Sequence, residues 1–67
     1  MSGNEEPSPL EIRILRALPH VKDMRELAKV VNVPPATLGM EIAKLQMAGY
    51  LGADGAITEK GSKALGS

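Results

Sequence analysis

Two helix-start signals lie 15 residues apart near the beginning of this chain, and a third follows 12 residues later. Residues 8–11 read Ser-Pro-Leu-Glu, a capping box with Ser8 at the N-cap and a proline at the first helical position. Residues 23–26 read Asp-Met-Arg-Glu and repeat this signature, and Pro35 opens the third helix. This spacing predicts three short helices joined by tight connections.

Apolar side chains recur at helical spacing within each predicted helix. Pro19 is expected to end the first helix, because the residue before a proline is pushed out of the α region. Asn32 suits a left-handed position at the end of the second helix, and Gly49 suits the same role after the third. The predicted core positions are Leu10, Ile14, Leu15, Leu18, Met24, Leu27, Ala28, Val31, Leu38, Ile42 and Leu45.

The pattern changes after Gly49. Two short strand-like runs, Tyr50–Ala53 and Ala56–Thr58, flank an Asp-Gly pair, which predicts a type I′ β-hairpin. Thr58 can then cap a last short helix from Glu59 to about Leu65. The expected fold is therefore mainly α with a small β-hairpin, in the order of three helices, hairpin and C-terminal helix.

The chain is short enough for a single domain, with 67 residues, no cysteine and one aromatic residue, Tyr50. Residues 1–7 are rich in Pro, Ser, Gly and Asn and are expected to be a disordered leader. Residues 8–65 form the predicted domain, and residues 66–67 are either a frayed end or a cloning remnant. The core of the domain must be aliphatic, and disulfides and cysteine-based metal sites are excluded.

Four segments carry a family resemblance. Residues 25–29 read Arg-Glu-Leu-Ala-Lys, 33–38 Val-Pro-Pro-Ala-Thr-Leu, 45–51 Leu-Gln-Met-Ala-Gly-Tyr-Leu and 57–61 Ile-Thr-Glu-Lys-Gly. In this order and spacing they resemble the winged helix-turn-helix family of prokaryotic and archaeal transcription regulators. The resemblance covers residues 10–65 and implies a three-helix core, a hairpin wing and a short C-terminal helix.

The resemblance also implies that the third helix binds duplex DNA in the major groove while the wing reaches an adjacent groove or phosphate. Carried onto this sequence, the expected DNA-binding residues are Arg25, Pro35, Ala36, Thr37, Gly39, Met40, Lys44 and the wing tip Ala53, Asp54 and Gly55. Lys60 and Lys63 could contact phosphates behind the wing. A DNA-binding module of transcription-regulator type is the main functional expectation.

The charge pattern favours an alternative function. The chain has eight basic and eight acidic residues, whereas DNA-binding proteins usually carry a basic excess. In residues 35–56 only Lys44 is basic, against Glu41 and Asp54, and family members typically have Ser and Arg where Gly39 and Met40 stand here. The outward stripe Ala36, Met40, Ala43 and Met47 would then be a protein interface, either for a homodimer or within a larger assembly.

No residue pattern indicates an enzyme. His20 is the only histidine and has neither a second histidine nor a cysteine as a partner, so no catalytic residue and no metal ligand is expected. The sequence contains no phosphate-binding glycine motif, which leaves no cofactor or small-molecule ligand indicated. No apolar run is long enough to cross a membrane, and we expect a cytoplasmic location.

Overall fold

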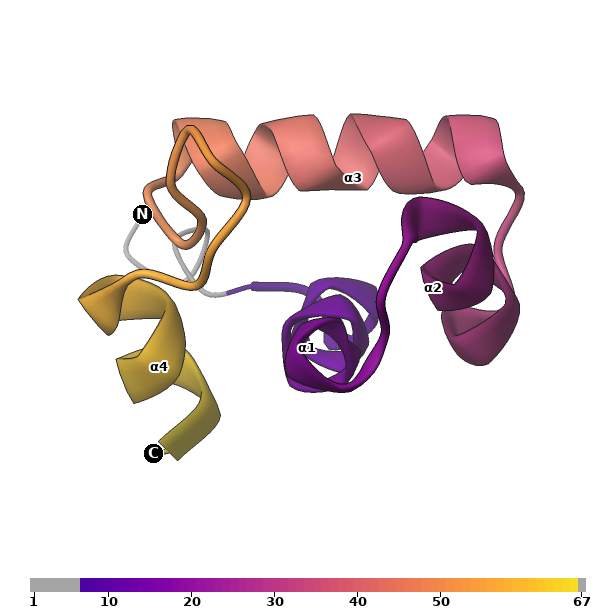
Figure 1. The fold of residues 1–67 in the computed structure, drawn as a ribbon. Helices are drawn as coiled ribbons and strands as arrows, with labels where there is room; N and C mark the ends of the chain where they lie inside the picture. The colour runs from indigo at the N-terminus through magenta and orange to yellow at the C-terminus, as the bar shows by residue number, and fades with distance from the viewer. Residues whose placement is uncertain (1–6, 67) are drawn as a thin grey trace.

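Each helix begins at the position that the sequence marks as its start. The computed structural model describes residues 7–66, and its helices are joined by short turns (Figure 1). The elements are α1 (Pro9–Ala17), the 3-10 helix η2 (Leu18–His20), α2 (Met24–Val31), α3 (Pro35–Met47) and α4 (Glu59–Gly66). The expected leader, apart from Pro7, and Ser67 lie outside the described residues.

Side-chain caps explain where the first two helices begin. The Ser8 hydroxyl accepts a hydrogen bond from the Glu11 backbone N–H at 3.2 Å, and the Glu11 carboxylate accepts one from the Ser8 N–H at 2.8 Å. The Asp23 carboxylate accepts from the Glu26 N–H at 2.8 Å. These bonds satisfy N–H groups that have no partner within the helix, and they confirm both predicted N-caps.

The predicted helix ends are also confirmed. α1 gives way at Ala17 to η2, which contains Pro19. Asn32 follows α2 in the left-handed region with a φ of 62°, and Gly49 follows α3 with a φ of 89°. The three-residue turn Asn32–Pro34 then leads directly from α2 into α3.

α3 crosses one side of the molecule above α1, while α2 and α4 lie toward opposite ends of it (Figure 1). α1 contacts both α2 and α4, and α2 contacts α3. The core is aliphatic apart from one tyrosine, and consists of Ile14, Leu15, Leu27, Ala28, Val31, Leu38, Leu45, Tyr50 and Leu51. Leu10, Leu18 and Ile42 pack against its edge as partly buried residues. The prediction for Met24 is wrong, since this residue is 46% exposed.

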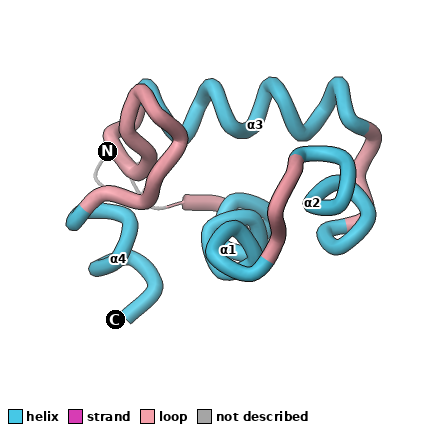
Figure 2. The backbone as a smooth tube through the Cα atoms, viewed as in Figure 1, coloured by secondary structure: helices cyan, strands magenta, loops and turns pink. Residues whose placement is uncertain are grey.

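The expected β-hairpin wing is not present, so the expected fold class was wrong on this point. Among residues 7–66 there is no strand, and residues 48–58 form a loop (Figure 2). A single antiparallel bridge between Leu51 and Ile57 is all the β-structure that this loop contains. The regular secondary structure of the described domain is therefore helical, and residues 53–55 are the tip of a tight loop and not of a wing.

The turn at Asp54 and Gly55 also differs from the predicted type I′ turn. A type I′ turn needs a positive φ at both central residues, but among the described non-glycine residues only Asn32 has one. Gly55 has a φ of 84°, and its N–H donates to the Gly52 carbonyl at 2.9 Å, which closes a different turn. The Asp54 carboxylate instead accepts from the Ala56 N–H at 3.0 Å.

The first residues of the loop are hydrogen-bonded to the end of α3. The N–H groups of Tyr50 and Leu51 both donate to the Leu45 carbonyl, at 2.9 and 3.3 Å, and so serve the end of the helix. The Tyr50 N–H is therefore not available for strand pairing, and the pairing is limited to the bridge at Leu51 and Ile57, flanked by the bonds from the Thr58 N–H to the Tyr50 carbonyl at 3.1 Å and from the Gly52 N–H to the Ala56 carbonyl at 2.8 Å.

In the described part of the chain, no helix combines the length and the apolar character that crossing a bilayer requires.

Candidate functional site

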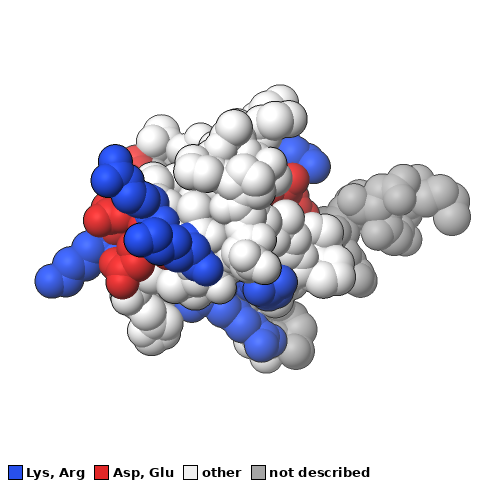
Figure 3. Space-filling view, turned by 90° about the vertical axis from the view of Figure 1, so that its right-hand side faces the viewer, with Lys and Arg blue, Asp and Glu red and all other residues white. Residues whose placement is uncertain are grey.

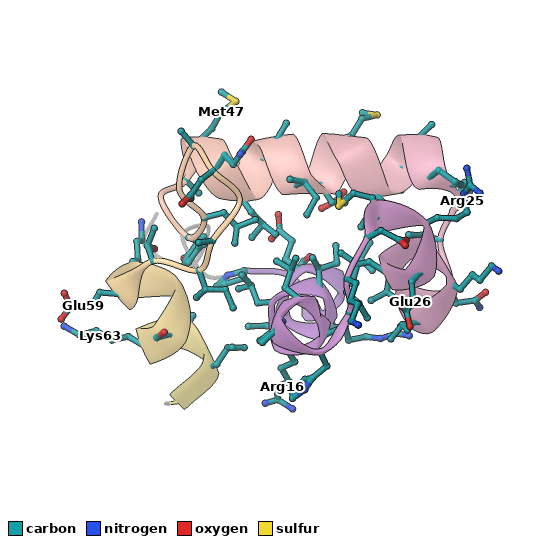
Figure 4. All side chains as sticks on the ribbon, in the orientation of Figure 1. Arg16, Arg25, Glu26, Met47, Glu59 and Lys63 are labelled. Carbon is teal, nitrogen blue, oxygen red and sulfur yellow. The ribbon has the colours of Figure 1, made fainter. Side chains whose placement is uncertain are left out.

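α3 has one face on the core and one face free. Leu38 and Leu45 point inward and are each 1% exposed, with Ile42 packed beside them. The opposite side of the helix is directed away from the other helices, as Met47 shows in Figure 4. α3 is thus anchored in the core by one face and exposes the other face to solvent.

The free side of α3 is apolar. At about 100° per residue, four side chains fall within about 60° of one another on it. We call this set the outer face of α3: Ala36, Met40, Ala43 and Met47. All four are exposed, and Met40 and Met47 retain 68% and 88% of their accessible surface. The structure therefore brings together every residue of the predicted protein interface.

The one basic residue of α3 is already paired. The Lys44 Nζ lies 3.5 Å from the Glu41 Oε2, and the side chains are 62% and 16% exposed respectively. A partly exposed ion pair is weak, but it leaves little net charge on this part of the helix. The attraction to phosphates that dominates DNA affinity is therefore small along α3.

Exposed basic side chains lie on α1 and α2, and before α2. They are Arg13, Arg16, Lys22, Arg25 and Lys29. Seen from the α2 side, Lys and Arg side chains gather with acidic ones over one flank and the lower part of the molecule, and much of the rest is uncharged (Figure 3). In Figure 4, Arg25 lies beside the start of α3 while Arg16 points away on the opposite side of α1. The positive charge is thus beside and below α3, not on its outer face.

The predicted DNA-binding residues fall at the two ends of α3, with Gly39, Met40 and Lys44 along the helix between them. Arg25, Pro35, Ala36 and Thr37 meet at the beginning of α3, where Arg25 and Pro35 line two shallow depressions. The loop 53–55 lies near the other end of the helix, because the Gln46 side-chain amide donates to the Gly52 carbonyl at 3.1 Å. A helix of 13 residues separates them, a distance of about 20 Å.

Lys60 has a structural role that the sequence analysis missed. Its Nζ donates to the Ala48 carbonyl at 2.7 Å and lies 4.8 Å from the centre of the Tyr50 ring. It therefore caps the end of α3 from α4, and is not directed toward an outside phosphate as expected. A basic residue 12 positions after a helix end gives no sequence signal for such a contact.

The described residues contain no group of three or more His, Cys, Asp and Glu side chains that could hold a metal ion. His20 is exposed at the end of η2. The outer face of α3 remains the most distinctive surface feature of the domain. Comparison with known proteins adds no assignment, since no family model, curated protein or solved structure matches this chain.

Proposed function

We propose that this domain is a protein-association module that docks through the outer face of α3. The observation that carries the proposal is the exposure of Met40 and Met47 on one stripe with Ala36 and Ala43. Burying a methionine side chain contributes about 1.5–3 kcal/mol, so a partner that covers both gains several kcal/mol. Methionine also adapts its shape to an irregular partner surface.

The support given by α3 suits this role. Its inner residues Leu38 and Leu45 are fixed in the core, so the backbone that carries the methionines is held in place. A docking surface on a fixed helix loses less conformational entropy on binding than one on a loop.

A photoreactive amino acid placed at Met40 or Met47 tests this function in the cells that make the protein. We expect covalent adducts with polypeptide from both positions. The matched control is the same amino acid at Arg16, which lies on α1 away from α3 (Figure 4). Adducts with nucleic acid only, or the same adducts from all three positions, would refute the proposal.

DNA binding is the second candidate, and a specific feature favours it. Pro34 stands at the N-cap of α3 without a side-chain cap, and the exposed side chains of Arg25 and Lys29 line a depression beside it. The positive end of a helix dipole with two cations nearby attracts phosphate. The outer face offers no hydrogen-bonding side chain for base edges, so such binding would be independent of sequence.

Fluorescence anisotropy with a mixed-sequence duplex tests this second candidate at about 20–50 mM salt, where phosphate contacts are strongest. If DNA binds here, the double variant Arg25→Gln/Lys29→Gln weakens the affinity and reduces its salt dependence. Arg16→Gln, which removes one charge elsewhere, is the control. Absence of binding to the wild-type protein at low salt would exclude the candidate.

A further inference from the structure

We propose that the partner of the outer face of α3 is a second copy of this chain, docked with the two α3 helices antiparallel about a twofold axis. This inference rests on the proposed function and names its partner. The four residues follow one another at intervals of four, three and four positions. This order of intervals is the same when it is read backwards, so a twofold axis at the middle of the stripe sets each of the four positions opposite another of the four.

The side-chain sizes fit the same arrangement. Along α3 the outer face reads Ala, Met, Ala, Met, so a reversed copy reads Met, Ala, Met, Ala. Met47 of one chain then faces Ala36 of the other, and Met40 faces Ala43, which sets each large side chain against a small one. A parallel arrangement would set methionine against methionine and leave gaps between the alanines.

The flanks of the outer face allow two copies to approach. Lys44 lies on one flank, and its ion pair with Glu41 of the same chain leaves little net charge there. Gly39 lies on the other flank with open space above its Cα, so the helices can approach closely there. The formal net charge of zero adds no overall repulsion between copies.

The size of the surface sets the expected affinity. α3 has 13 residues and is about 20 Å long, and a pair of such helices buries less than the roughly 800 Å² per partner of a standard interface. We therefore expect a weak dimer whose dissociation constant lies between about 1 µM and 1 mM.

Engineered thiols provide the test, because the chain has no cysteine of its own. Proteins carrying Ala36→Cys and Met47→Cys are oxidised separately and as a mixture. The antiparallel pair predicts a disulfide-linked dimer in the mixture, because position 36 of one copy faces position 47 of the other. Little dimer is expected with either protein alone, since the two copies of position 36 lie about 16 Å apart. Dimers from each protein alone, with none favoured in the mixture, would overturn this geometry.

Sedimentation equilibrium up to about 1 mM protein gives the second measurement, at the upper limit of the expected dissociation constant. We expect a dimer that Met40→Glu/Met47→Glu abolishes. A monomer at every concentration overturns the second copy as partner. A protein that stays monomeric alone and forms a complex only when duplex DNA is added overturns it in favour of DNA.

The two proposals can fail separately. A monomeric protein that still gives polypeptide adducts from positions 40 and 47 rejects the second copy but keeps the docking function. A monomer without such adducts rejects both.

Discussion

Gly61 of α4 packs directly against the backbone of Tyr50, so that a Cβ atom added to Gly61 would overlap the Tyr50 carbonyl oxygen. The same Cβ would lie 2.9 Å from the Ile57 Cγ2. A glycine in a helix normally costs about 1 kcal/mol relative to alanine, but here it is what allows α4 to approach the loop.

Gly61→Ala is therefore expected to destabilise the domain by about 1–3 kcal/mol through overpacking, despite the better helix propensity of alanine. Chemical denaturation monitored by circular dichroism measures the change. Gly39→Ala is the matched control, because Gly39 also lies within a helix but nothing approaches its Cβ position within 4 Å. The control should raise the stability by up to about 1 kcal/mol. Equal effects at both positions would contradict the contact.

The Thr58 side chain links the end of the loop both to Gly49, just after α3, and to Gly61 in α4. Its hydroxyl donates to the Gly49 carbonyl at 2.6 Å and accepts from the Gly61 N–H at 3.2 Å. Thr58→Val keeps the shape and removes both bonds, and we expect a loss of about 1–3 kcal/mol in the free energy of unfolding. Thr58→Ser, which retains the hydroxyl, should lose clearly less. A valine variant as stable as the wild type would show that these bonds contribute nothing.

Lys60 and Lys63 lie on the same helix but should differ in importance. Lys60 donates to the Ala48 carbonyl, whereas Lys63 lies 3.8 Å from Glu59 in a strongly exposed pair. Lys60→Gln should lower the free energy of unfolding by about 1 kcal/mol. Lys63→Gln should change it by less than about 0.5 kcal/mol, as exposed pairs usually do. Thermal unfolding of the two variants measures this difference, and equal losses of stability would contradict the special role of Lys60.

Substitutions on the two faces of α3 should differ strongly in their effect on monomer stability. Leu45→Ala removes a buried side chain and is expected to cost about 2–5 kcal/mol. Met40→Glu and Met47→Glu change exposed positions and should alter monomer stability by no more than about 0.5 kcal/mol. Denaturant titrations at low protein concentration measure both. If the methionine variants unfold the monomer, their side chains are needed for folding and the outer face is not free.

Local chemistry made the helices predictable. Ser8, Asp23 and Asn32 each act through bonds or backbone angles within a few residues of themselves, so their roles could be derived from the sequence. The inward positions of α3 and its exposed stripe followed from helical periodicity.

The loop after α3 depends on contacts between residues that are distant in the sequence, so its structure could not be predicted from local patterns. The Asp54-Gly55 pair predicts a hairpin locally, but the Tyr50 N–H donates to the Leu45 carbonyl at the end of α3 and the pairing stops at the Leu51–Ile57 bridge. Met24 was misplaced for a different reason. It lies on the same side of α2 as Leu27 and Val31, but in the first turn at the end of the helix, where it stays 46% exposed.

The most direct test of the account compares backbone amide NMR spectra of the labelled protein at about 50 µM and about 1 mM, and then with a duplex at about 20–50 mM salt. The account predicts concentration-dependent shifts centred on Ala36, Met40, Ala43 and Met47, and no response of these residues to DNA. Shifts of these four residues that appear only with DNA, and fade as salt is added, would contradict it.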